Sequence, residues 1–125
     1  MDALSRYRPQ ILSILRIMAG LLVMQHGTTK LLHSPETQLS GVSVFGMVGI
    51  AGIIELVCGA LVVVGFKTRI AAFLLSGMTA VAYFMVHAPN GFFPLLNGGE
   101  LVALYSFVFL YIAAAGPGPI SIDRR

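Results

Sequence analysis

Four long apolar runs make up most of this chain, and short segments rich in charged or turn-forming residues separate them. The runs cover residues 11–32, 45–66, 70–87 and 99–115. A helix needs about 20 mostly apolar residues to cross a bilayer once. Of all residues, 57% are hydrophobic and only 10% are charged, which is unlike a soluble protein. The sequence therefore predicts an all-α fold in which residues 1–125 form one domain, an integral membrane four-helix bundle in contact with the lipid bilayer.

The segment HAPNGFFPLLNGGE, from His87 to Glu100, separates the third apolar run from the fourth. Pro89 and Pro94 have no backbone N–H to donate, and the glycines permit tight turns, so this segment cannot continue a membrane helix. We expect a structured loop at the edge of the membrane, lying over the ends of the neighbouring helices.

Lysine and arginine gather on alternate connections of the four helices. Four crossings put both termini and the turn between the second and third helices on one side of the membrane. That side carries Arg6, Arg8, Lys67, Arg69, Arg124 and Arg125, whereas the other side carries chiefly Lys30. The positive-inside rule then predicts that both termini are cytoplasmic and that the His87–Glu100 loop faces outward.

Two charged residues lie deep in the apolar runs. Arg16 is in the first run, and Glu55 is near the middle of the second. At 1.5 Å per residue, Arg16 lies roughly 9 Å and Glu55 roughly 16 Å from the cytoplasmic ends of their helices, a difference that a long arginine side chain can span. Because an unpaired charge in a membrane is costly, we expect Arg16 and Glu55 to form a structural ion pair, with a catalytic role for the pair as the alternative.

A second group of polar residues lies at the predicted outer end of the bundle. His26 and Lys30 are four residues apart and share a helix face, while His87 and Glu100 flank the loop. Histidine and lysine can donate to a quinone carbonyl, and glutamate can exchange a proton, so these four residues are the predicted catalytic group. The predicted substrate-binding residues are Tyr83, Phe84, Asn90 and Asn97. The alternative is a polar network that only holds the helix ends and the loop.

Several kinds of site lack support in the sequence. The single cysteine, Cys58, cannot form an intrachain disulfide, and no CxxC, HExxH, Walker or GxGxxG motif is present, so we predict no metal site. His26 and His87 are the pair that could ligate a haem, which we do not expect. The net charge of +3 follows the loops and termini, so we interpret it as a topology signal and expect no nucleic-acid partner.

The order and spacing of several short fragments resemble the DoxX family along nearly the whole chain. Two fragments match best: AYFMVHAPNGFFPLLNGGE, from Ala82 to Glu100, and AAAGPGPISID, from Ala113 to Asp123. The individual residues that carry the resemblance are Arg16, Gly20, His26, Gly27, Lys30, Glu55, Leu56, Gly59, Gly65, Thr68 and Arg69.

This resemblance implies a small multi-pass protein of the bacterial inner membrane. Members of the family are linked to quinone-coupled oxidation, to respiratory oxidase complexes and to oxidative-stress resistance, so the resemblance implies a subunit of a quinone-linked oxidoreductase with redox partner proteins. Two other functions stay open: a non-enzymatic scaffold that recruits redox partners, and a small-molecule transporter. The sequence also leaves open whether the chain forms a homo-oligomer and whether it is catalytic alone.

Overall fold

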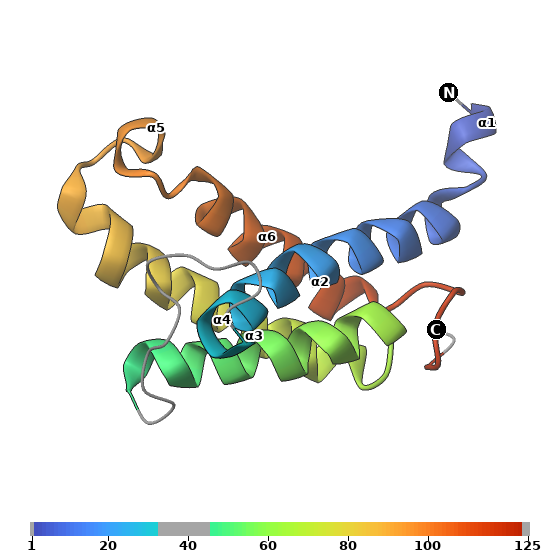
Figure 1. The fold of residues 1–125 in the computed structure, drawn as a ribbon. Coiled ribbons are helices and arrows are strands. Elements are labelled where there is room, and N and C mark those ends of the chain that lie inside the picture. Colours follow the sequence, from blue (N-terminus) through green and yellow to red (C-terminus); the bar gives the residue numbers. More distant parts are fainter. Residues whose placement is uncertain (1, 33–45, 124–125) are drawn as a thin grey trace.

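The computed structural model describes residues 2–32 and 46–123, and the regular structure within these ranges is entirely helical (Figure 1). This confirms the predicted all-α class. The elements in chain order are α1 (Asp2–Ser5), α2 (Arg8–Leu32), α3 (Met47–Val64), α4 (Thr68–Ala82), the π-helical turn η1 (Tyr83–His87), the 3₁₀ turn η2 (Ala88–Asn90), α5 (Pro94–Asn97) and α6 (Glu100–Ala115).

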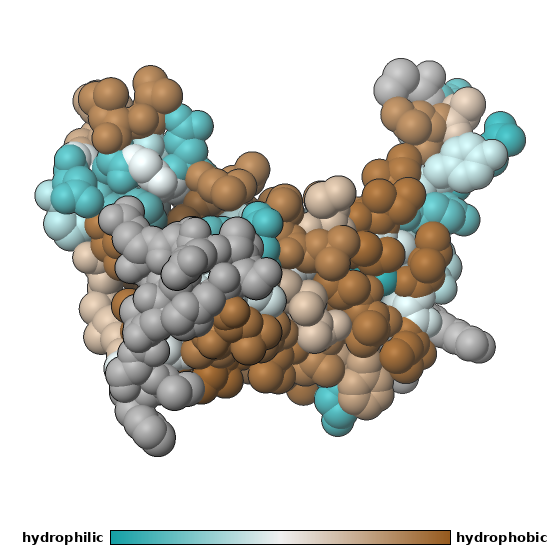
Figure 2. Space-filling model, in the orientation of Figure 1, coloured by the Kyte–Doolittle hydropathy of each residue, from teal (hydrophilic) through white to brown (hydrophobic). Residues whose placement is uncertain are grey.

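Three stretches of the described chain are long and apolar enough to cross a membrane. They are Arg8–Leu32, Met47–Val64 and Thr68–Asn90. The fourth apolar helix, α6, has 16 residues and therefore a length of about 24 Å, less than the roughly 30 Å of hydrocarbon in a bilayer. Apolar residues cover most of the face shown in Figure 2. The predicted four-helix arrangement is thus present as three candidate spans and one shorter helix.

The four long helices pack as two antiparallel hairpins. The most extensive contacts join α2 to α3 and α4 to α6, and α3 also packs against α4 (Figure 1). Gly65 and Lys67 both adopt left-handed backbone conformations, which turns the chain sharply between α3 and α4. Leu75, Phe109 and Ile112 fill the α4–α6 contact and are fully buried.

Glycines allow α2 and α3 to approach closely. A Cβ atom on Gly27 would lie 2.7 Å from the carbonyl oxygen of Gly52, and one on Gly20 would lie 3.1 Å from that of Gly59. Gly20 and Gly27 are seven residues apart on α2, and Gly52 and Gly59 are seven residues apart on α3. The two contacts therefore occur at matching positions along the antiparallel helices. In a membrane, where apolar burial gives no net drive, such close approach stabilises helix pairs through dispersion. Gly52 and Gly59 therefore lie at the α2–α3 contact.

Arg16 connects three parts of the chain through backbone carbonyls. Its Nε donates to Val62 at 2.8 Å, and its Nη2 donates to Val63 at 3.3 Å and to Ile120 at 2.6 Å. Its Nη1 donates to the carbonyl of Pro117. Two of these carbonyls, Val62 O and Val63 O, lie in the last turn of α3, where helical partners run out, and Val62 O also accepts from Gly65 N–H at 3.2 Å. Arg16 therefore caps α3 and binds the C-terminal tail to it.

Asp123 completes this attachment at the start of α4. Its carboxylate accepts hydrogen bonds from the backbone N–H groups of Lys67 at 3.1 Å and Thr68 at 3.0 Å, and from the Thr68 hydroxyl at 2.9 Å. An acidic group at a helix start satisfies free donors and complements the helix dipole. The tail also extends along α3, since Ile122 N–H donates to Val64 O at 3.1 Å. We call Arg16, Asp123 and their partners the tail clasp.

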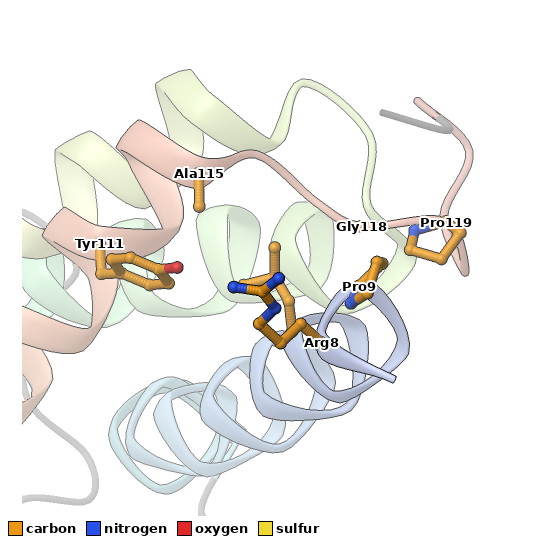
Figure 3. A pocket seen from close by; sticks show the side chains of 7 residues that line it. Arg8, Pro9, Tyr111, Ala115, Gly118 and Pro119 are labelled. Atoms are coloured by element: carbon orange, nitrogen blue, oxygen red, sulfur yellow. The ribbon is translucent and has the colours of Figure 1, made fainter. Parts of the chain in front are cut away.

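A groove opens beside the tail clasp, between the start of α2 and the end of α6 (Figure 3). It has a volume of about 490 Å³. Arg8 and Tyr111 are its polar lining residues, and its other walls are formed by Pro9, Leu12, Ala115, Gly118 and Pro119.

Candidate functional site

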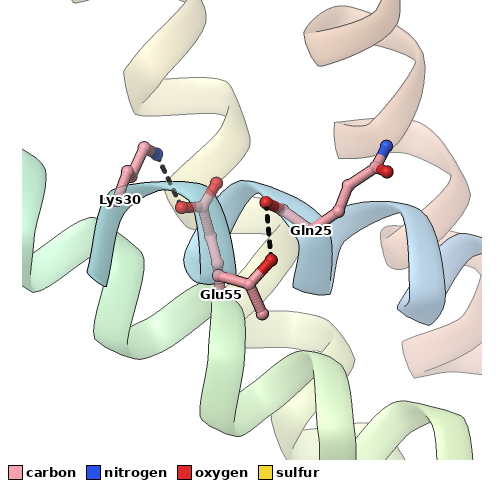
Figure 4. A network of polar contacts seen from close by, with 4 residues as sticks. Gln25, Lys30 and Glu55 are labelled. Carbon is pink, nitrogen blue, oxygen red and sulfur yellow. Dashed lines mark hydrogen bonds and ion pairs between the residues drawn. The ribbon is translucent and has the colours of Figure 1, made fainter. Parts of the chain in front are cut away.

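The candidate site is centred on an ion pair between α2 and α3. Lys30 Nζ lies 2.6 Å from Glu55 Oε1, and the two side chains are only 11% and 8% exposed (Figure 4). Gly52 lies one turn before Glu55 on α3, and a Cβ there would lie 3.2 Å from Lys30 Cβ. Because Gly52 has no side chain, the lysine stem can pass across α3 and reach the carboxylate.

The predicted ion pair between Arg16 and Glu55 is wrong. Glu55 pairs with Lys30, and Arg16 binds backbone carbonyls. Arg16 lies opposite Val62, seven residues beyond Glu55 and therefore about 10 Å from it along the helix axis. The last turn of α3 supplies carbonyls much closer to the guanidinium, so these are the acceptors it takes.

Tyr105 of α6 brings a third helix to the ion pair. Its ring is 4% exposed and stacks near Phe109, with ring centroids 5.8 Å apart. His26 of α2 meets the same ring edge-on, with centroids 6.4 Å apart. The Glu55 carboxylate interacts electrostatically with both His26 and Tyr105. We call His26, Lys30, Glu55 and Tyr105 the intramembrane cluster.

The Tyr105 hydroxyl has no hydrogen-bond partner within residues 2–32 and 46–123. A buried hydroxyl without a partner costs about 1–3 kcal/mol, so nearly all such groups in proteins are satisfied. The intramembrane cluster therefore holds a buried hydroxyl that no group of the described residues bonds. Within residues 2–32 and 46–123, it is the one buried side-chain nitrogen or oxygen atom without a partner.

A second polar cluster lies in the segment between α4 and α6. Asn97 donates to the Tyr83 hydroxyl at 3.2 Å and to Gly91 O at 2.9 Å, and its Oδ1 accepts from Gly99 N–H at 2.8 Å. His87 Nδ1 lies 3.1 Å from the carbonyl oxygen of Asn97. The π-helical turn holds the Tyr83 and His87 rings 6.4 Å apart. We call Tyr83, His87 and Asn97 the loop cluster.

The structure divides the predicted catalytic group. His26 and Lys30 belong to the intramembrane cluster, His87 belongs to the loop cluster, and Glu100 is exposed at the start of α6. Among the described residues, no hydrogen bond or ring contact joins the two clusters. Asn97 bonds the polar groups of the loop, including Tyr83, Gly91 and Gly99, and His87 contacts the Asn97 carbonyl oxygen. His87 therefore has its partner within the loop and not on α2.

The predicted binding residues divide in the same way. Tyr83 and Asn97 form the loop cluster, whereas Phe84 is exposed and stacks edge-on against Tyr83 at 5.4 Å. Asn90 donates to Val86 O at 3.0 Å and is exposed. The four predicted binding residues therefore lie in or beside the loop cluster, at the end of the bundle, and are separate from the intramembrane cluster.

Sequence reasoning missed Tyr105 and the role of Glu55 beside it. The position of each residue, counted from the helix ends nearest the loop, would have indicated both. Lys30 lies about 3 Å from the end of α2, Tyr105 about 7 Å from the start of α6 and Glu55 about 12 Å from the start of α3, so all three lie in the same half of the bundle. Depth measured from this end, instead of from the termini, selects Lys30 as the partner of Glu55.

Comparison with known proteins places the chain in a family. The DoxX family model matches residues 11–88, more than half of the chain. The fragments Ala82–Glu100 and Ala113–Asp123 lie largely or wholly beyond that match.

An uncharacterized protein of Haemophilus influenzae is 42% identical over 130 residues, covering 100% of this chain and 97% of its own length. Rv3486 of Mycobacterium tuberculosis, an uncharacterized membrane protein, is 26% identical over 136 residues, covering 94% of this chain and 81% of its own. No solved structure matches this chain significantly.

Proposed function

This chain belongs to the DoxX family, and we propose that it is a multi-pass membrane subunit of a quinone-linked redox system that binds a quinone-like molecule at the intramembrane cluster. The observation that carries the proposal is the buried Tyr105 hydroxyl, which has no partner among the described residues. A ligand that accepts a hydrogen bond inside an apolar environment would satisfy it.

The side chains of the intramembrane cluster fit the chemistry of a quinone carbonyl. A carbonyl oxygen only accepts hydrogen bonds, and the Tyr105 hydroxyl and the Lys30 ammonium are donors. The ring of such a molecule is apolar and suits a site among membrane helices. Glu55 and His26 are groups that can take up and release a proton. The cluster thus combines carbonyl recognition with proton exchange.

The reaction requires a second component. Conversion of a quinone to a quinol takes two electrons and two protons. In the proposed system the electrons come from the redox group of a partner protein, and the protons pass through ionisable side chains such as Glu55. This chain contributes binding and proton transfer, and the proposed location is the bacterial inner membrane.

A binding titration with a short-chain benzoquinone analogue on the detergent-purified protein tests the proposal. Tyr105→Phe removes the donor without changing the ring, and we expect about tenfold weaker binding, the upper range for one hydrogen bond. Glu55→Gln should weaken binding as well, because the carboxylate holds Lys30 in position.

Tyr83→Phe is the matched control. It removes the same hydroxyl from the loop cluster, where Asn97 already uses it, and should leave binding unchanged. Equal binding by the parent and Tyr105→Phe would overturn the proposed site. Loss of binding in Tyr83→Phe alone would return the site to the His87–Glu100 loop.

A further inference from the structure

The groove between α2 and α6 lies at the opposite end of the bundle from the intramembrane cluster, and we propose that it binds an anionic phospholipid. Its volume of about 490 Å³ is within the range of 300–1,000 Å³ typical of small-molecule sites. Figure 3 shows the Arg8 guanidinium and the Tyr111 hydroxyl turned toward one another across it.

Arg8 is suited to bind a phosphate group. Its Nε donates to Ser5 O at 3.2 Å, which orients the guanidinium, and its two terminal nitrogens have no hydrogen bond within the described residues. The planar guanidinium presents paired donors that match phosphate oxygens. Tyr111 adds a hydroxyl, so the groove offers donors and no acidic lining residue.

The rest of the groove is apolar and preformed. Its apolar lining residues suit the upper part of an acyl chain and the glycerol carbons. The tail forms one wall, and a Cβ on Gly118 would lie 2.7 Å from Pro9 O, so the tail is packed directly on α2. α2 and α6 make few contacts with each other compared with α2 and α3, which leaves the space between them open to lipid.

The position along the bundle also favours a lipid headgroup. Arg8 is the first residue of α2, and Tyr111 is four residues from the end of α6, so both lie near one membrane surface. Tyrosine is enriched at that depth, and basic pockets between membrane helices bind anionic headgroups. Positive charge at this end, from Arg6, Lys67 and Arg69, complements the negative charge of such lipids.

Native mass spectrometry of the detergent-purified full chain tests the proposal. The probes are phosphatidylglycerol and phosphatidylcholine with identical acyl chains, and inorganic phosphate. We expect preferential retention of phosphatidylglycerol by the parent. Arg8→Gln should reduce that retention about fivefold, the effect of losing one basic contact at an anionic surface. Tyr111→Phe should reduce it by a smaller factor.

Arg6→Gln is the control, because Arg6 is an exposed arginine outside the groove. It should retain phosphatidylglycerol as the parent does. An equal loss in Arg6→Gln and Arg8→Gln would show general charge attraction and overturn the site. Equal retention of both lipids by the parent would also overturn it, and Arg8-dependent binding of inorganic phosphate at the same affinity would assign the groove to a soluble anion.

Discussion

Arg16 and Lys30 are two cations of the same helix, and the structure treats them differently. Arg16 is 1% exposed and donates to four backbone carbonyls from α3 and the C-terminal tail. Lys30 makes one short contact with Glu55, close to a buried hydroxyl that has no partner among the described residues.

The difference separates a structural site from a functional one. At Arg16 each of the three guanidinium nitrogens donates to a protein carbonyl, so the site holds α2, α3 and the tail together. At Lys30 the charge is neutralised by Glu55, and the Tyr105 hydroxyl of the same cluster has no partner in the described part of the chain. A buried charge in a membrane therefore indicates function only when its surroundings leave a polar group available.

The largest expected effect is at Arg16. Arg16→Gln removes charged hydrogen bonds to carbonyls that have few other partners, and we expect a loss of about 3 kcal/mol or more in the free energy of unfolding. Thermal unfolding in detergent measures it. Arg16→Lys should recover little, because one ammonium cannot reach four carbonyls in α3 and the tail at once.

Arg69→Gln is the matched control for Arg16. Arg69 also donates to carbonyls, those of Ala113 and Ala114, but these bonds are exposed to solvent. Arg69→Gln should lower the free energy of unfolding by about 1 kcal/mol or less, since water can bond the carbonyls in place of the arginine. Similar losses for the two arginines would contradict the assignment of Arg16 as a buried clasp.

The next effect concerns the ion pair. Lys30→Met should lower the unfolding free energy by about 2 kcal/mol, less than the Arg16 change, because Glu55 can take up a proton whereas a carbonyl cannot. Lys30→Met combined with Glu55→Leu should recover most of this loss. A double-mutant cycle measures the coupling, and simple additivity of the single losses would argue against a pair in the membrane.

A comparable or smaller effect is expected where α2 and α3 approach beside the pair. Gly27→Ala places a Cβ 2.7 Å from Gly52 O, and since backbone atoms cannot move aside cheaply we expect a loss of about 1–3 kcal/mol. Gly77→Ala is the control, because nothing lies within 4 Å of a Cβ there, and helix propensity should make it neutral or stabilising. A neutral Gly27→Ala would mean that the helices separate freely.

The smallest stability effect is expected at Tyr105. Tyr105→Phe removes a hydroxyl without a partner among the described residues, so unfolding should be unchanged or slightly harder. Tyr83→Phe should cost about 1 kcal/mol, since it removes the acceptor of Asn97. If Tyr105→Phe proves the more destabilising of the two, the hydroxyl has a partner in the folded chain and is not available to a ligand.

The sequence by itself determined the helical class and the approximate positions of the four apolar helices, whereas the π-helical turn Tyr83–His87 and the short helices α1 and α5 were not predicted. The predicted first helix, residues 11–32, is Arg8–Leu32, and the predicted fourth, residues 99–115, is Glu100–Ala115. These features follow from local properties: apolar residues sum along the chain, and glycine and proline end helices wherever they occur. The gathering of Arg8, Lys67 and Arg69 at one end of the bundle could also be predicted, because it depends only on which connections between helices carry basic residues.

Only the tertiary structure decided which polar groups meet. Lys30, Glu55 and Tyr105 come from three helices, and their contact depends on how far α2 and α3 slide along one another and how each helix is rotated. The seven-residue glycine pairing sets that register by allowing contact at Gly27–Gly52 and Gly20–Gly59. The same register moves Arg16 beyond the reach of Glu55 and onto the carbonyls at the end of α3. Partner choice in a bundle is thus a property of helix geometry, which residue types alone do not specify.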